Sequence, residues 1–252
     1  MAELKKIVRF LDDYLKINDI KDDSWNGLQV EGRSEVKKAV FAVDAGKEIF
    51  KKAIEEKADL IVVHHGHFWK TSNPSIRGWN KERIELLLSN GISLYAVHLP
   101  LDKHKETGNN VLLLKMLGAK IEEGFAQHEG DNVGWIGKLE KPVKIKDIEE
   151  KLNSELNTKC TVLAFGKEKV KTIAVCSGGG GYPIFFEALN KNVDLYVTGD
   201  AIEIYHVAKD AEFNVIFAGH HATETVGVKA LSEIIKKKFD VGCVFVDIQT
   251  GL

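Results

Sequence analysis

The sequence has few cysteines, few prolines and no long apolar run. Its three cysteines, Cys160, Cys176 and Cys243, are odd in number, widely spaced and set among apolar neighbours. This pattern argues against a disulfide framework or a zinc knuckle and predicts reduced thiols in the core. Apolar runs such as residues 60–63 are far shorter than the roughly 20 residues of a membrane helix. The sequence therefore predicts no membrane span.

Charge of neither sign dominates. The 35 Lys and Arg residues nearly balance the 37 Asp and Glu residues, and the formal net charge is -2. A global attraction to nucleic acid or to a membrane surface is not expected, although a local basic patch is not excluded. The first residues form an amphipathic pattern rather than a secretory signal, which predicts a cytoplasmic protein. With 252 residues, 44% of them hydrophobic, the chain can form one large domain or two small ones.

Short apolar runs rich in β-branched residues alternate with amphipathic segments along the chain. The runs predict strands at Ala39–Val43, Leu60–Val63, Ser93–Val97, Thr172–Cys176, Leu195–Thr198, Val215–Ala218 and Val244–Ile248. Helical periodicity predicts helices at Gly46–Lys57, Lys81–Ser89, Asn110–Leu117, Ile145–Leu156, Ile184–Asn190, Ala201–Lys209 and Thr225–Lys238. Strands that alternate with helices in this way are typical of an α/β protein.

The middle of the chain has a different composition, because Gly124–Glu140 is rich in Gly and lacks a helical period. We therefore expect a discontinuous first α/β lobe, residues 1–125 plus 220–252, and a second α/β lobe, residues 126–219. A plan of strand, polar loop and helix begins at Val40 and again at Thr172. This repetition predicts two related three-layer α/β lobes, with the functional site in the cleft between them.

Histidines and carboxylates directly follow several of the predicted strands. The side chains in question are His64, His65, His98, Asp102, His220 and Glu224. Because the carboxyl ends of parallel strands line a common crevice, we expect these side chains to meet there. If a helix begins near His221, then His220 and Glu224 lie one turn apart on one helix face, where both can reach the same metal ion.

Three imidazoles and two carboxylates suit two divalent metal ions better than one. The expected ligands are His64, His65, Asp102, His220 and Glu224. Zn, Fe, Mn, Co or Ni fits this set, because it lacks the Cys of structural zinc sites and contains too much His for Ca or Mg. Glu224 would bridge the two ions and leave a position open for water. Spacing alone leaves a second interpretation open, in which these are core and turn histidines without a metal.

Other polar and aromatic features have two interpretations each. The loop Ser177–Gly181 favours a tight strand-to-helix turn over a phosphate-binding loop, because it matches no phosphate-binding fingerprint. Asp44 is expected to cap the helix that follows it. The aromatic residues Phe68, Trp69 and Trp79 would either stack on a base or pack at a subunit interface.

Several segments together resemble the NIF3-like family, whose members are often called GTP cyclohydrolase 1 type 2 homologues. They are Trp25–Gly32, Val63–Trp69, His98–Asp102, Cys176–Gly180, Val197–Asp200 and Gly219–Glu224. The resemblance covers nearly the whole chain and is closest to short members without a central insert domain. It implies a two-lobed α/β subunit, a dinuclear metal site between the lobes and a toroidal homohexamer. By match of motif, the family's metal ligands are the five residues that the spacing had indicated.

The resemblance also implies an activity. The protein would be a dinuclear metal-dependent hydrolase, in which metal-bound hydroxide attacks a nucleotide-like substrate, at guanine C8 if that substrate is GTP. His98 matches a family position beside the metals and would transfer protons. Asp200 matches a position where family members carry Glu or Asp. The alternative is a ring-shaped, metal-stabilised binding or regulatory protein without catalysis, whose partner is DNA or a protein; the near-neutral charge counts against DNA.

Overall fold

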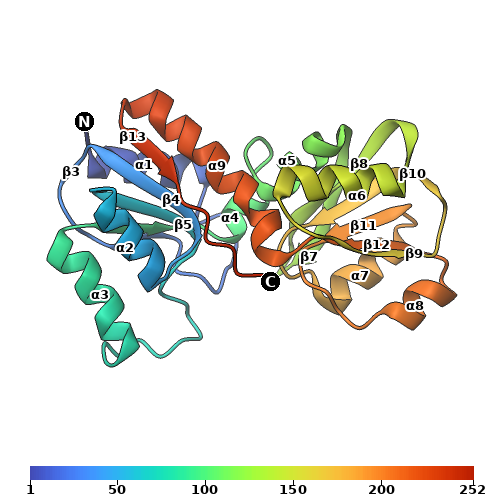
Figure 1. Ribbon diagram of the computed structural model, residues 1–252, viewed down its shortest axis with the longest axis horizontal. Helices are drawn as coiled ribbons and strands as arrows, with labels where there is room; N and C mark the ends of the chain where they lie inside the picture. Colours follow the sequence, from blue (N-terminus) through green and yellow to red (C-terminus); the bar gives the residue numbers. More distant parts are fainter. The chain divides into compact units, whose positions relative to one another are not determined.

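The computed structural model describes Met1–Leu252 and divides into two compact units (Figure 1). Unit 1 comprises Met1–Leu101 and Gly227–Ile248, and unit 2 comprises Asp102–Val226 and Gln249–Leu252. Residues 102–125 and 220–226 were expected in the first lobe but belong to unit 2, as do the terminal residues 249–252. The physical reason is the core of unit 2, which contains apolar side chains from both segments, among them Leu113, Leu114 and Val226.

Unit 1 is built on a five-stranded sheet. The strand order is β13 (Gly242–Phe245), β4 (Lys38–Asp44), β5 (Leu60–His65), β6 (Ser93–Ala96) and β2 (Gly27–Val30). The first four strands are parallel, and β2 runs antiparallel to β6. A separate two-stranded ribbon pairs β1 (Ala2–Glu3) with β3 (Glu35–Val36).

Helices cover both faces of the unit 1 sheet (Figure 1). Ala39, Phe41 and Val43 of β4 pack against α1 (Leu4–Leu15) and the C-terminal part of α9 (His220–Phe239). Val40 and Ala42 of β4 point to the other face, which α2 (Lys47–Glu55) and α3 (Trp79–Asn90) cover. This alternation follows from the two-residue period of a strand, and it makes unit 1 a three-layer α/β structure.

Unit 2 contains a six-stranded sheet. The strand order is β7 (Ala119–His128), β8 (Asp131–Lys144), β10 (Lys169–Cys176), β11 (Leu195–Thr198), β12 (Asn214–Phe217) and β9 (Thr161–Ala164). Strands β10, β11 and β12 are parallel, whereas the other pairs are antiparallel. Helices α5 (Asn109–Leu117) and α6 (Ile145–Leu156) cover one face, and α7 (Gly181–Asn190) covers the other, with α8 (Tyr205–Asp210) after β11 (Figure 1).

The predicted α/β class is confirmed, and the two units share a plan. The order β4–β5–β6 in unit 1 matches the order β10–β11–β12 in unit 2, and a helix follows the first strand of each set. Every predicted strand overlaps an observed one, but the long β7–β8 hairpin was not predicted. The segment 99–102 forms the single helical turn α4 (Leu99–Asp102), although it contains Pro100. Proline is compatible with a helix in its first turn, where no N–H donor is needed.

None of the helices combines the length and the apolar character that a membrane crossing requires. The longest helix, α9, has 20 residues and carries Lys236, Lys237 and Lys238 in its last turn.

Candidate metal centre

Three histidines gather at the carboxyl edge of the unit 1 sheet. His64 and His65 are the last two residues of β5, and His98 lies just beyond β6. One ring nitrogen from each of the three side chains lies within 4.8 Å of the others. The structure thus brings together three of the residues that the sequence had singled out, all from unit 1.

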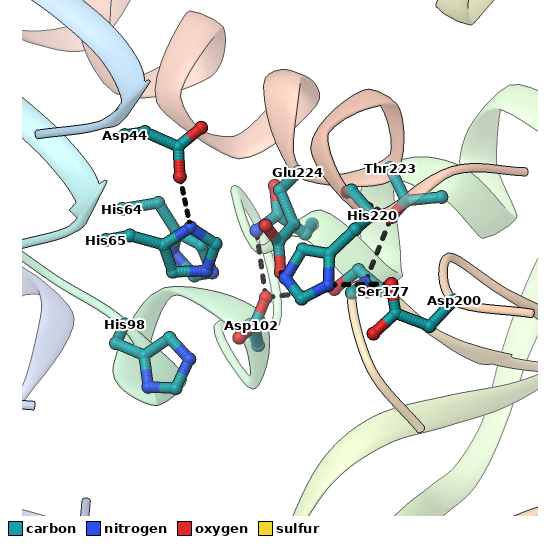
Figure 2. Close-up of polar contacts among 12 residues, drawn as sticks. Asp44, His64, His65, His98, Asp102, Ser177, Asp200, His220, Thr223 and Glu224 are labelled. Atoms are coloured by element: carbon teal, nitrogen blue, oxygen red, sulfur yellow. Dashed lines mark hydrogen bonds and ion pairs between the residues drawn. The ribbon is translucent and has the colours of Figure 1, made fainter. Parts of the chain in front are cut away.

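The rings of His64 and His65 are oriented by hydrogen bonds at Nδ1. His64 Nδ1 lies 2.9 Å from the backbone oxygen of Val97. His65 Nδ1 lies 2.7 Å from Asp44 Oδ1 (Figure 2). An oxygen acceptor at Nδ1 fixes the tautomer and leaves Nε2 as the atom that can coordinate a metal. Both side chains therefore have the arrangement of metal-ligating histidines.

His98 is oriented in the same way by a carboxylate that the sequence did not reveal. Its Nδ1 lies 2.8 Å from Oδ1 of Asp22, a buried side chain. Asp22 also accepts hydrogen bonds from the Ser24 N–H, the Asn26 amide and the Leu99 N–H. Burial alone would raise the pKa of Asp22, but the hydrogen bond and charge of His98, together with the hydrogen bonds from Asn26 and Ser24, hold that pKa well below its usual range. Asp22 is thus a fixed negative partner for the His98 ring.

Trp69 lies beside these histidines. Its ring centroid is 5.0 Å from that of His98 and 6.1 Å from that of His65. The indole N–H donates to the Gly66 backbone oxygen at 3.0 Å, which holds the ring in place. The indole ring of Trp69 therefore forms one wall of the histidine cluster.

Unit 2 contains a buried carboxylate at the end of α4. Asp102 Oδ1 accepts hydrogen bonds from Ser177 Oγ at 2.9 Å and from the Asn109 amide at 2.8 Å (Figure 2). Both bonds are made to the same oxygen. A carboxylate oriented through one oxygen can offer its second oxygen as a metal ligand.

The N-terminal turn of α9 supplies the remaining pair. The helix begins at His220, earlier than expected, so His220 and Glu224 lie one turn apart. His220 Nε2 lies 3.3 Å from Glu224 Oε1, and His220 Nδ1 lies 2.9 Å from Asp200 Oδ1 (Figure 2). Burial alone would lower the pKa of His220, but the hydrogen bonds and charges of Glu224 and Asp200 raise it to about 9. A metal ion would replace that proton at Nε2.

The glycine-rich loop Ser177–Gly181 connects β10 to α7 in a tight turn. Gly178 has φ +61°, and a Cβ at this position would collide with the Glu224 carboxylate and lie 3.1 Å from His220 Nε2. A Cβ on Gly180 would collide with the Tyr196 hydroxyl. The glycines thus make room for a ligand pair and a core side chain, which supports the interpretation of the loop as a close-packed turn.

Two carboxylates near the histidines were missed or misassigned from the sequence. The expectation that Asp44 caps a helix was wrong, because the N-cap of α2 is Gly46, without a side-chain hydrogen bond. Asp44 instead contacts His65, and its place directly after a strand was the signal for this role. No local signal marks Asp22, which lies 76 residues from His98 in the sequence.

The donor set fits borderline divalent metal ions. Four imidazoles, those of His64, His65, His98 and His220, have Nδ1 directed at an oxygen acceptor. Unit 2, which carries His220, also contains the buried carboxylates Asp102 and Glu224. Imidazole with carboxylate is typical of Zn, Fe, Mn, Co and Ni sites, and carboxylate or carbonyl acceptors behind the imidazoles are typical of protein metal centres.

Comparison with known proteins gives the family. The model of the family described as Duf34/NIF3 (NGG1p interacting factor 3) matches residues 2–251. The chain belongs to the Duf34/NIF3 family. The resemblance inferred from the sequence motifs is thereby confirmed.

Relatives of this Duf34/NIF3 chain match it from end to end. A protein of Archaeoglobus fulgidus named "GTP cyclohydrolase 1 type 2 homolog" is 46% identical over 250 residues, which cover 99% of each chain. The crystal structure of TTHA1606 from Thermus thermophilus is 39% identical, with a TM-score of 0.89 and 100% coverage of both chains. The structure of protein ybgI, described as of unknown function, is 35% identical, with a TM-score of 0.92 and the same coverage. The chain is therefore similar to whole proteins of this family rather than to one part of them.

Proposed function

We propose that this protein is a dinuclear metal-dependent hydrolase that acts on a nucleotide-like substrate. The observation that carries the proposal is the common orientation of the histidine rings, each with Nδ1 directed at an oxygen acceptor. A buried imidazole held in this way is costly unless its Nε2 has a use. Metal coordination and proton transfer are the two uses that fit this chemistry.

The proposed metal ligands are the five residues that the sequence motifs indicated. They are His64, His65, Asp102, His220 and Glu224. Glu224 is proposed as the bridging ligand, because its carboxylate has two oxygens and lies beside an imidazole ligand in the same helical turn. Zn, Fe, Mn, Co or Ni is the expected metal.

When bound, two such ions would supply Lewis-acid activation of a water molecule and of the electrophilic group of the substrate. The protein's own contribution is to fix the ligands. Asp44 and Asp200 orient His65 and His220, and Ser177 holds Asp102. Trp69 packs beside His65 and His98 and would shield that side of the two rings from bulk water.

His98 is the proposed proton-transfer group. Asp22 holds its Nδ1, so Nε2 is the atom that would accept a proton from the attacking water and return it to the leaving nitrogen. Its ring centroid lies 5.1 Å from that of His64 and 5.6 Å from that of His65, so His98 lies directly beside two proposed ligands.

The nature of the substrate is supported by the names of relatives. Proteins 46% and 38% identical to this chain carry the name "GTP cyclohydrolase 1 type 2 homolog". A guanine nucleotide is therefore the first substrate to test, with opening of the imidazole ring at C8 as the reaction. We also propose that the protein assembles into a toroidal homohexamer.

The test is turnover of GTP by metal-reconstituted protein, followed as formate release, in the wild type and in His98→Gln. We expect His98→Gln to keep its metal and to lower kcat by about 10²- to 10⁴-fold, the usual contribution of a general acid or base. His206→Gln, a change at an exposed histidine, serves as the control and should leave both unchanged.

Two results would contradict this account. Equal loss of metal in His98→Gln and Glu224→Ala would identify His98 as a ligand instead of a proton-transfer group. A wild-type protein that holds two ions but hydrolyses no nucleotide would favour the alternative of a metal-stabilised binding protein for DNA or a protein partner.

A further inference from the structure

Arg83 of α3 is a half-buried guanidinium without an anionic partner. The Arg83 side chain forms neither a hydrogen bond nor an ion pair. Its pKa is lowered, and burial is the cause. Arginine side chains that are withdrawn from water are normally paired with carboxylates or phosphates. An unpaired, half-buried arginine therefore indicates a binding site for an anion.

The guanidinium is held in place by aromatic side chains. Arg83 Cζ lies 5.1 Å from the ring centroid of Trp79, which precedes it by one helical turn. The Trp79 ring in turn packs against the buried side chain of His67, with a centroid separation of 6.2 Å. A stacked guanidinium loses little freedom when its planar fork binds an oxyanion.

The N-terminus of α2 faces the same guanidinium. A Cβ built on Gly46, the N-cap of α2, would lie 3.8 Å from Arg83 Nη2 and have no other heavy atom within 4 Å. No side chain caps the first turn, so its backbone N–H groups remain available. Helices α2 and α3 pack side by side on one face of the sheet (Figure 1). An open space bounded by a guanidinium and by helix N–H groups suits a phosphate.

This space lies in the same unit as the histidine cluster, and a short piece of chain connects the two. Gly46 follows Asp44 by two residues, and Asp44 Oδ1 contacts His65 Nδ1 at 2.7 Å. Two residues span at most about 7 Å, so with the side chains and contacts at either end the guanidinium lies at most roughly 18 Å from the His65 ring. The separation of the base and the phosphate in one nucleotide falls within this limit.

We infer that Arg83 and the first turn of α2 form an oxyanion subsite, which binds a phosphoryl group of the substrate. The inference rests on the proposed function in one respect, because it assigns that group to the molecule hydrolysed at the metal centre. The charged groups nearby have other partners and leave the guanidinium to the anion. Asp44 contacts His65, and Lys47 is paired with Glu82. The substrate class is thereby narrowed to phosphorylated compounds.

The test is calorimetric titration of the full-length protein, as purified, with inorganic phosphate. Arg83→Gln should weaken binding at least about tenfold, because a charge-assisted bidentate contact is lost. Gly46→Asp should abolish binding, because it places a carboxylate beside the guanidinium. Aspartate is also a favourable N-cap residue, so Gly46→Asp should keep or raise the melting temperature. Arg77→Gln, at an exposed arginine before the same helix, is the matched control and should bind as the wild type does.

A second titration compares GMP with guanosine. The wild type should prefer GMP, and Arg83→Gln should lose the preference. Phosphate binding that survives in both Arg83→Gln and Gly46→Asp would overturn the subsite. If the surviving phosphate binding is lost together with the metal in Glu224→Ala, phosphate binds at the metal centre. In that case the proposed function stands without the subsite. If phosphate binding depends on Arg83 in a protein that holds no metal, the subsite stands and the proposed function fails.

Discussion

Histidine orientation is the central feature of this protein at the scale of single residues. The imidazoles follow strands, so the sequence could identify them together with Asp102 and Glu224. It could not identify the acceptors behind the rings. Val97 lies 33 residues from His64, and Asp22 lies 76 residues from His98, so these contacts exist only once the chain has folded. Local patterns predict which side chains reach the sheet edge, but not what holds them there.

Gly178 gives the sharpest prediction at this scale. Gly178→Ala should lower metal content, because the new Cβ would occupy the place of the Glu224 carboxylate. The backbone at Gly178 has φ +61°, so alanine would also cost about 1–2 kcal/mol of strain. The measurement is metal per chain together with the melting temperature.

Gly130→Ala separates the two effects. Gly130 also has a positive φ, of +94°, but a Cβ there would meet nothing within 4 Å. Both variants should lose stability, whereas only Gly178→Ala should lose metal. Equal metal content in the two variants would mean that the glycine serves the turn alone.

At the scale of secondary-structure elements, each of the two large sheets has an aspartate that connects neighbouring strands at their amino ends. Asp59, just before β5, accepts hydrogen bonds from the backbone N–H groups of Lys37 and Lys38. Asp194, just before β11, does the same for Lys171 and Thr172 at 2.9 and 3.0 Å. The repeated contact supports the kinship of the two units that the repeated strand–loop–helix plan predicted.

The Asp194 contact predicts a pH-dependent stability. Burial alone would raise the pKa of Asp194, but its hydrogen bonds to Lys167, Lys171 and Thr172 lower it from 3.8 to about 2. A lowered pKa in the folded state contributes stability above about pH 4, and this contribution is lost as the pH falls towards 2. Asp194→Ala should therefore destabilise the protein by about 1–2 kcal/mol at pH 7.

Urea denaturation of the wild type and of Asp194→Ala at pH 7, 4 and 2.5 measures this contribution. The difference between the two proteins should shrink as the pH falls. Asp210→Ala, at an exposed position, should show no such trend. A difference that stays constant across the pH range would attribute the effect of Asp194 to packing instead of charge.

The β7–β8 hairpin shows where element prediction failed. Its glycines hid the strand pattern, and the structure gives tertiary reasons for them. A Cβ on Gly134 would lie 2.5 Å from the Val175 backbone oxygen, and one on Gly137 would lie 3.0 Å from Leu114. Glycine in a strand weakens the alternation of apolar and polar residues that predicts a strand, but it lets neighbouring segments of the protein approach closely. The sequence shows only the first of these effects.

At the scale of the whole molecule, each unit carries a histidine of the candidate site at the same place in its own fold. His98 follows β6, the third parallel strand of one set, and His220 follows β12, the third of the other. Each has a carboxylate, Asp22 or Asp200, at Nδ1. The α/β class and the repeated plan could be predicted because strand and helix periodicities are local. The unit boundaries could not, because the hydrophobic core decides where α5 packs.

The most direct test of the dinuclear centre is elemental analysis of the protein purified without chelator or added metal. We predict about two moles of Fe, Zn, Mn, Co or Ni per chain, as two-metal hydrolytic sites contain. Glu224→Ala should hold less than half of this amount, whereas Glu155→Ala, at an exposed position, should match the wild type. A wild-type protein without transition metal even after reconstitution, or Glu224→Ala with undiminished metal, would contradict the account.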